Sequence, residues 1–182
     1  ARRMQTLIED LLTLSRVTTR AQPFVAVDIL QVTQEVLSDL EISIQQTGAT
    51  IEIGELPVID ADPLQMRQLL QNLIGNALKF HRKEIQPVVK IYSKILYDSE
   101  HVSPEQCQII VEDNGIGFNE KYLDRIFNVF QRLHGRSEYD GTGIGLAICR
   151  KIVERHQGSI TAKSEPGRGA KFIVTLPIHP HS

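Results

Sequence analysis

The sequence lacks tryptophan, a marked excess of charge of either sign, and any long apolar run. Its 182 residues include 20 basic and 22 acidic side chains, so the formal net charge is −2, and nothing indicates nucleic acid or an anionic membrane as a partner. There is no apolar run of about 18 residues and no signal-peptide pattern. We therefore expect a soluble segment that makes no membrane contact and lies in the cytoplasm.

Cysteine is also scarce. Cys107 and Cys149 are the two cysteines of the chain, and their spacing is not that of metal ligands. Cys107 precedes a strand-like run and Cys149 lies inside an apolar helical pattern. We expect two buried, reduced thiols.

What is present is an ordinary globular composition, with 41% hydrophobic residues, arranged as helical patterns followed by strand patterns. Helices are expected at residues 1–20, 28–47, 63–80, 119–127 and 143–157, and strands at residues 49–53, 88–96, 108–112, 159–164 and 170–176. Asp62-Pro63 is a helix-start signal, with Asp as N-cap and Pro at the first helical position. The order of elements predicts an α+β fold, a two-layer α/β sandwich with helices on one face of a mixed sheet.

The first helix has an apolar stripe of nearly 3.5-residue period. Met4, Leu7, Leu11 and Leu14 form it, and Ile8 and Leu12 widen it. Such a stripe suits a coiled coil or helical bundle, although a helix that packs on its own domain is the alternative. No capping residue precedes Ala1, so we expect this helix to be the end of a longer one.

The break at residues 21–23, Ala-Gln-Pro, predicts a domain boundary. We expect a bundle helix over residues 1–21, a second domain over residues 24–178, and a short tail over residues 179–182.

A glycine-rich turn precedes the helix at 143–157. Gly141, Gly143 and Gly145 alternate with Thr142 and Ile144, and Leu146 begins the apolar helical pattern. Such a turn offers free backbone N–H groups and the positive end of a helix dipole, which together favour a phosphate. The polar residues 128–142 before it form a long loop of the kind that often acts as a lid.

The helix at 63–80 carries Asn72, Asn76 and Lys79 on one face, at i, i+4 and i+7. An asparagine amide oxygen is a hard ligand suited to Mg²⁺, and lysine can meet a phosphate as a point charge. A solvated polar face is the alternative interpretation.

Two further stretches have the same ambiguity. Residues 113–117, Asp-Asn-Gly-Ile-Gly, follow a predicted strand. Asp113 could accept a hydrogen bond from the amine of adenine, and Gly115 and Gly117 could leave room for a flat base. The alternative is that the stretch is a simple β-turn. Phe127 and Phe130 either anchor a loop in the core or hinge a lid that brings Arg132 to the phosphates.

Taken in order, these four stretches resemble the asparagine box, first glycine box, phenylalanine box and second glycine box of the ATP-binding domain of sensor histidine kinases. The resemblance covers residues 24–178, and residues 7–17 resemble the end of the second helix of the dimerisation and phosphotransfer domain. Residues 131–135 and 152–156 are similar to phytochrome-type kinases.

The resemblance implies the Bergerat fold of the GHKL superfamily, a mixed sheet covered on one face by three helices, with ATP and Mg²⁺ as cofactors. It implies Mg²⁺ at Asn76 and a nucleotide held by Asn72, Asn76, Lys79, Asp113, Gly115, Gly117, Phe130, Arg132, Gly141, Thr142, Gly143, Gly145 and Leu146. One departure is Ala170, where the family more often has Ser or Thr.

The related ATPases of this fold use a glutamate as general base at the position of Asn72, and an asparagine cannot take that proton. The sequence therefore favours a histidine kinase, with a response regulator receiver domain as partner and a homodimer formed through the N-terminal helix. None of its six histidines precedes an acidic residue in an amphipathic helix, so we expect no autophosphorylation of this chain. The alternatives are a nucleotide-binding regulatory module without kinase activity and a GHKL ATPase.

Overall fold

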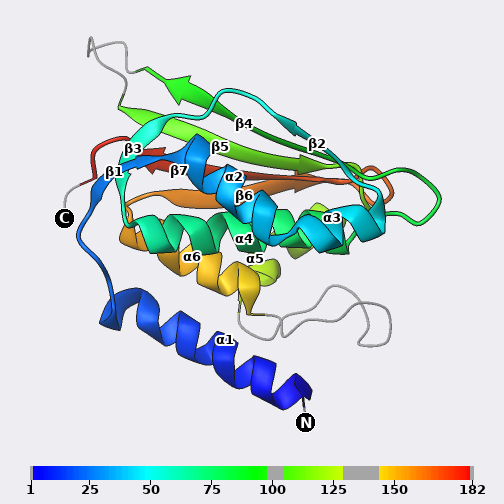
Figure 1. Cartoon of the computed structure of the whole chain (residues 1–182), viewed down its shortest axis with the longest axis horizontal. Coiled ribbons are helices and arrows are strands. Elements are labelled where there is room, and N and C mark those ends of the chain that lie inside the picture. The colour runs from blue at the N-terminus through cyan, green and yellow to red at the C-terminus, as the bar shows by residue number, and fades with distance from the viewer. Residues whose placement is uncertain (1, 98–104, 129–143, 181–182) are drawn as a thin grey trace.

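The fold is a two-layer sandwich with one additional helix (Figure 1). The structure, a computed structural model, describes residues 2–97, 105–128 and 144–180. Helices cover one face of a mixed sheet, as the order of elements in the sequence predicts.

Over the described residues, the main sheet has five strands in the order β2-β4-β5-β7-β6. They are β2 (Thr50–Ile53), β4 (Val88–Leu96), β5 (Gln106–Asp113), β6 (Ser159–Ser164) and β7 (Ala170–Pro177). Strand β2 is parallel to β4, and the other neighbouring pairs are antiparallel. A separate antiparallel pair joins β1 (Val25–Asp28) to β3 (Val58–Ala61).

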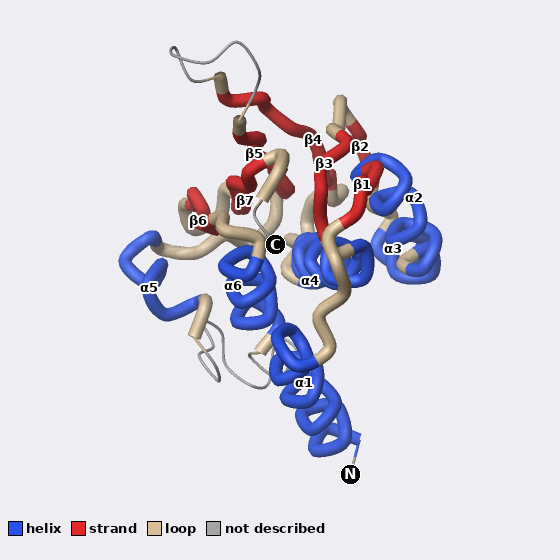
Figure 2. Tube along the Cα trace, turned by 90° about the vertical axis from the view of Figure 1, so that its left-hand side faces the viewer, coloured by secondary structure: helices blue, strands red, loops and turns tan. Residues whose placement is uncertain are grey.

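Figure 2 shows α4 and α6 side by side beneath the sheet and α1 below them, while α2 lies beside β1 and packs on α4. The helices are α1 (Arg2–Thr19), α2 (Ile29–Asp39), α3 (Glu41–Thr47), α4 (Pro63–Lys79), α5 (Leu123–Ile126) and α6 (Gly145–Arg155), with a 3₁₀ turn η1 at Glu120–Tyr122 before α5.

Local chemistry explains where the central helix begins. Oδ1 of Asp62 accepts hydrogen bonds from the backbone N–H groups of Leu64 and Gln65, at 3.1 and 3.2 Å, and Pro63 occupies the first turn. These contacts satisfy donors that have no partner within the helix. The predicted start of this helix is confirmed.

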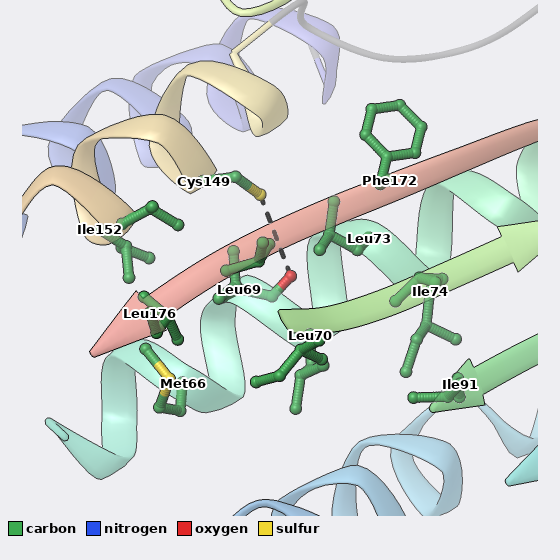
Figure 3. Close-up of a cluster of buried hydrophobic side chains, with 14 of the residues drawn as sticks. Met66, Leu69, Leu70, Leu73, Ile74, Ile91, Cys149, Ile152, Phe172 and Leu176 are labelled. Atoms are coloured by element: carbon green, nitrogen blue, oxygen red, sulfur yellow. Dashed lines mark hydrogen bonds between the residues drawn. The ribbon is translucent and has the colours of Figure 1, made fainter. Parts of the chain in front are cut away.

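The core lies between the sheet and helices α4 and α6 (Figure 3). Helix α4 contributes Met66, Leu69, Leu70, Leu73 and Ile74, each at most 1% exposed. They meet residues of β4, α6 and β7, which Figure 3 labels Ile91, Cys149, Ile152, Phe172 and Leu176. Both cysteines are buried and free, as predicted, and burial raises the pKa of Cys107 to about 11 and that of Cys149 to about 12.

The prediction of one helix over residues 28–47 is wrong, because the backbone leaves the helical region at Leu40 and divides it into α2 and α3. Helix α3 ends at Gly48 in the left-handed region, as expected. The short strands β1 and β3 were not predicted, since each is stabilised by pairing with a strand distant in sequence. The helix expected at 119–127 is η1 followed by α5.

Helix α1 packs on the sandwich through one side. Val17 is buried, and Leu7 and Leu14 are partly buried against the core, with α6 as the neighbouring helix. Its other side is exposed, with Met4 at 67% and Ile8 at 54%. One part of the apolar stripe, with Leu7 and Leu14, packs on this chain, as the second interpretation predicts. The other part, with Met4 and Ile8, is exposed, which is compatible with a helical bundle. Over the described residues, no helix is long and apolar enough to span a bilayer.

Candidate nucleotide-binding site

Helix α4 presents its polar residues beside its core face. Asn72, Asn76 and Lys79 are half-buried, and the apolar residues between them, Leu73, Ile74, Ala77 and Leu78, are buried in the core. The ammonium group of Lys79 lies 5.3 Å from the centroid of the Phe80 ring, where a cation is favoured. The three side chains therefore share a partly exposed face that borders the core.

Asn72 joins two helices. Its Nδ2 donates a hydrogen bond to the carbonyl oxygen of Gly145 at 3.2 Å, and its Oδ1 accepts one from Nε2 of Gln68 at 3.2 Å. A side-chain amide can do both because it carries a donor and an acceptor. Asn72 thereby ties α4 to the first residue of α6.

Asp113 is held at the end of β5 by the backbone. Its Oδ1 accepts hydrogen bonds from the N–H of Gly115 at 2.8 Å and from that of Ala170 at 3.2 Å. Among the described residues, Oδ2 has no hydrogen-bond partner. Burial raises the pKa of Asp113 to about 6, although the two N–H groups oppose this shift, and the charge of Glu112 adds to it. The departure at Ala170 leaves its backbone contact to Asp113 intact.

The two glycines after Asp113 pack against other backbone. A Cβ at Gly115 would lie 2.3 Å from the carbonyl oxygen of Phe80, and one at Gly117, where φ is +65°, would lie 2.2 Å from that of Glu165. The N–H of Ile116 also donates to the Phe80 carbonyl at 2.9 Å. The glycines are thus explained by close packing of the turn onto the end of α4 and onto the 165–169 turn.

These contacts place the two ends of a candidate site along one helix. The start of α6 meets α4 at Asn72, and the turn after Asp113 meets it at Phe80. Because an α-helix rises ~1.5 Å per residue, these points lie ~12 Å apart along its axis. Asn76 lies between them.

Among the described residues, no side chain caps the N-terminus of α6. Ile144, at the cap position, is buried, and Gly145 and Leu146 are half-buried. The first N–H groups of a helix and its dipole favour an anion there. The remaining residues of the predicted phosphate turn, Gly141, Thr142 and Gly143, lie outside the described residues.

The phenylalanine pair is described in part. Phe127 is buried, and its ring meets that of Phe172 edge-on, with centroids 6.3 Å apart. This contact favours the interpretation of Phe127 as a core anchor. Phe130 and Arg132 lie outside the described residues.

Gln68 and Asn114 were not among the predicted site residues. Gln68 lies one turn before Asn72, a spacing that could have indicated it. The side chain of Asn114 accepts a hydrogen bond from the N–H of Val88 at 2.9 Å and donates one to the carbonyl of Gln86 at 3.1 Å. These two hydrogen bonds hold the loop before β4 against the turn that follows β5. No local sequence pattern predicts them.

The fold and these residues define a class of protein. The family model of histidine kinase-, DNA gyrase B- and HSP90-like ATPases matches residues 61–180, and the chain belongs to this family. Its fold is the Bergerat α/β fold of histidine kinase catalytic domains. The catalytic domain of histidine kinase ThkA, without nucleotide, superposes with a TM-score of 0.72 and 26% identity, over 87% of this chain and 98% of that one. Full-length ShkA in complex with AMPPNP gives a TM-score of 0.78 and 27% identity, over 98% of this chain and 36% of that one.

Among curated proteins, the chain is similar to phytochrome-like protein Cph1 of Synechocystis sp., with 43% identity over 175 residues, or 96% of this chain and 22% of the relative. Cyanobacterial phytochrome A of Nostoc sp. is 45% identical over 175 residues, with the same two shares. The adaptive-response sensory kinase SasA of Synechocystis sp. is 30% identical over 184 residues, 97% of this chain and 45% of the relative. The chain thus spans about a fifth of the length of the two phytochromes, and the predicted resemblance to phytochrome-type kinases is confirmed.

Proposed function

We propose that this chain is the ATP-binding catalytic domain of a two-component sensor histidine kinase. In this proposal ATP and Mg²⁺ lie along α4, and the γ-phosphoryl group passes to a histidine of a dimerisation domain. From there it passes to an aspartate of a response regulator receiver domain. The family and the named kinases among its relatives support this class of reaction.

One observation carries the nucleotide assignment: the two oxygens of Asp113 have different environments. Oδ1 is occupied by two backbone N–H groups, whereas Oδ2 has no partner in the described part of the chain. An oriented, half-buried carboxylate oxygen is suited to accept a hydrogen bond from an exocyclic amine, as adenine offers. Asp113 would therefore select adenine.

Asn76 is the residue we assign to Mg²⁺. Its side chain is half-buried midway along the site, with no hydrogen-bond partner among the described residues. No group of three or more His, Cys, Asp or Glu side chains in the described residues is suited to a metal. An amide oxygen together with substrate phosphates is a usual set of Mg²⁺ ligands, and the bound ion would neutralise phosphate charge.

At the phosphate end we assign the uncapped start of α6, with Gly145 and Leu146. Lys79 would supply a positive charge from α4. By resemblance, Gly141, Thr142, Gly143, Phe130 and Arg132 complete this end; they lie outside the described residues.

The bonds of Asn72 favour a kinase over an ATPase. Its amide is engaged by Gln68 and Gly145, and an amide has no basic site to take a proton from water. Hydrolysis by a glutamate-type base is therefore not expected of this site.

The adenine assignment is tested by exchanging the base and the residue together. In Asp113→Asn, Oδ1 can still accept from both backbone N–H groups, while the other end becomes a donor. By calorimetry, we expect wild-type protein to bind ATP more tightly than ITP, whose base has a carbonyl in place of the amine. D113N should lose about 10-fold or more in ATP affinity and prefer ITP.

Glu112→Gln is the matched control, because Glu112 is the neighbouring residue on the opposite face of β5, where it contacts Tyr92 and Lys171. It should keep the preference for ATP. An unchanged preference in D113N would refute the role of Asp113.

Phosphoryl transfer is tested separately, with γ-labelled ATP and an acceptor domain supplied in trans. We expect label on the acceptor histidine and none on this chain. Within the described residues, His81 caps the end of α4 through the Leu78 carbonyl, His156 is buried, and His179 pairs with Asp60. Tight ATP binding without transfer would instead favour a regulatory nucleotide-binding module.

A further inference from the structure

The end of α6 remote from the candidate phosphate site meets the linker between α1 and β1, residues 20–24. Arg155 and His156 close the helix there, beside the N-terminus of α4 at Asp62. Three segments distant in sequence therefore converge at one point of the molecule, on the side where the chain rises from α1 to the sheet (Figure 2).

Arg155 makes four contacts at this point. Its Nη1 donates to Oδ2 of Asp62 at 2.8 Å and to Oε1 of Gln65 at 2.7 Å. Its Nη2 donates to the carbonyl oxygen of Gln22 at 2.6 Å, and its guanidinium carbon lies 4.6 Å from the centroid of the Phe24 ring. A planar guanidinium can satisfy several acceptors and an aromatic face at once, which a lysine cannot.

Helix α4 holds the same linker through two side chains. Oδ2 of Asp62 accepts from the N–H of Gln22 at 2.8 Å, and Nε2 of Gln65 donates to the carbonyl oxygen of Val17 at 2.8 Å. Val17 lies in the last turn of α1, whose carbonyls have no partner within the helix. Gln65 therefore caps the C-terminus of α1.

His156 closes the cluster. Its Nε2 accepts a hydrogen bond from the N–H of Asp62 at 3.0 Å, and its Nδ1 donates to the carbonyl of Ile152 at 2.8 Å, so the ring is neutral. The ring stacks on Phe24 with centroids 4.6 Å apart. We call Arg155, Asp62, Gln65 and His156 the linker clamp.

The hydrogen bonds of the linker clamp to the α1–β1 segment are made mainly with backbone atoms. Both the N–H and the carbonyl of Gln22 are bonded, while its side chain is exposed. The Asp62 side chain is 1% exposed and that of Arg155 19%, so removing the arginine would leave a buried carboxylate with a lost partner. These contacts hold the backbone of the linker at the point where α1 leaves the sandwich. Helix α6 is tied at both ends, to Asn72 near the candidate phosphate site and to the linker.

We propose that Arg155 is a positioning residue for phosphoryl transfer: through the linker clamp it fixes the direction of α1 relative to the nucleotide. This inference rests on the proposed function, in which the acceptor histidine belongs to the helical bundle that contains α1. Because a misplacement of about 1 Å in the reacting groups can cost roughly 100-fold in rate, a loosened linker would slow transfer without changing the nucleotide site.

The clamp itself is tested in this chain without nucleotide, by hydrogen exchange. Arg155→Ala should speed exchange of the Gln22 amide about 10-fold or more, and Arg155→Lys should do so less. Arg150→Ala is the control, since Arg150 lies on the same helix and its one ion pair among the described residues is an exposed contact with Glu154 at 3.8 Å. Equal linker exchange in R155A and R150A would overturn the clamp.

Positioning is tested in the longer protein that includes the acceptor, from initial rates of phosphorylation at varied ATP. R155A should lower kcat about 10-fold or more with KM for ATP within about 2-fold, R155K should recover part of the rate, and R150A should match wild type. Gln65→Met provides a second route, because it removes the cap on α1 while keeping a good helix former of similar size.

The outcomes separate the two proposals. Unchanged kcat in both R155A and Q65M, with faster linker exchange, would overturn the positioning role alone. Failure of wild-type protein to bind ATP would overturn the proposed function and leave the exchange result standing.

Discussion

At the scale of single residues, the candidate site depends on polar side chains that the fold has already oriented. Asp113 has one oxygen occupied by backbone N–H groups, and Asn72 has both ends of its amide engaged. A side chain fixed in this way loses little conformational freedom when a ligand binds. The chemistry of each can therefore be tested by changing one atom.

The first prediction concerns pH. Because the pKa of Asp113 is about 6, the carboxylate is mostly ionised at pH 7 and mostly protonated at pH 5, and only the ionised oxygen accepts freely from adenine. ATP affinity measured by calorimetry should fall about 10-fold from pH 7 to pH 5. The D113N variant has no carboxyl group at this position. Its ATP affinity should change only by the smaller amount that comes from protonation of the ATP phosphates. A wild-type profile identical to that of D113N would contradict the assignment.

Ionisation of Asp113 should favour ATP binding but lower the free energy of unfolding. The folded-state pKa of Asp113 lies above its ordinary value of 3.8, so its ionisation costs stability as pH rises from about 4 to 6. D113N should therefore be no less stable than wild type at pH 7, which separates loss of binding from loss of fold.

Asn72 gives a second residue-scale prediction. In Asn72→Asp an oxygen would face the carbonyl of Gly145, so the tie between α4 and α6 becomes a repulsion. Without nucleotide, amides in the first turn of α6 should exchange faster, and ATP affinity should fall about 10-fold. Gln71→Glu, which adds the same charge at the neighbouring exposed position, should do neither. Unchanged exchange in N72D would show that Asn72 does not anchor α6.

At the scale of elements, α4 is the helix that the core, the linker and the turn after β5 all contact. One side supplies the core, its N-terminus holds the linker, and its C-terminal end receives the turn that follows β5. That turn approaches so closely that Gly115 has no room for a side chain.

Two glycine substitutions should therefore have opposite effects. Gly115→Ala would place a methyl group 2.3 Å from the Phe80 carbonyl oxygen and should lower the free energy of unfolding by ~1–3 kcal/mol. Gly75→Ala, inside α4 with no described residue within 4 Å of the added carbon, should raise it by ~0.5–1 kcal/mol. Chemical denaturation measures both. Equal effects would mean that the turn can move away from α4 at little cost.

At the scale of the whole molecule, α1 is bound on one side and exposed on the other. Val17 and the linker clamp fix its C-terminal end, while Met4, Ile8, Leu11 and Leu12 are exposed by 38–67%. An apolar stripe of this kind suits a second helix. We propose that it contributes to a homodimer.

Sedimentation equilibrium tests this proposal. Ile8→Glu places a charge in the centre of the stripe and should weaken self-association about 10-fold or more. Gln5→Glu adds the same charge at a neighbouring exposed position and should have little effect. The same association constant in both variants would argue that this face is not the interface.

The sequence by itself determined the elements whose signals are local. The apolar period predicted α1, α4 and α6, Asp62-Pro63 predicted the start of α4, and Gly48 predicted the end of α3. The ordered glycine and asparagine stretches were sufficient to predict the family. These signals are readable because helix periodicity, capping and turn chemistry act between residues a few positions apart.

Only the tertiary structure decided which partners these residues meet. The pairing of β1 with β3, the bond from Asn72 to Gly145, and the approach of Gly115 to Phe80 join segments that are distant in sequence. Nothing in the sequence around Arg155 indicates its partner, yet it contacts Asp62, which is 93 positions away. The physical reason is that such contacts depend on how helices pack on the sheet, and no short stretch of sequence encodes that packing.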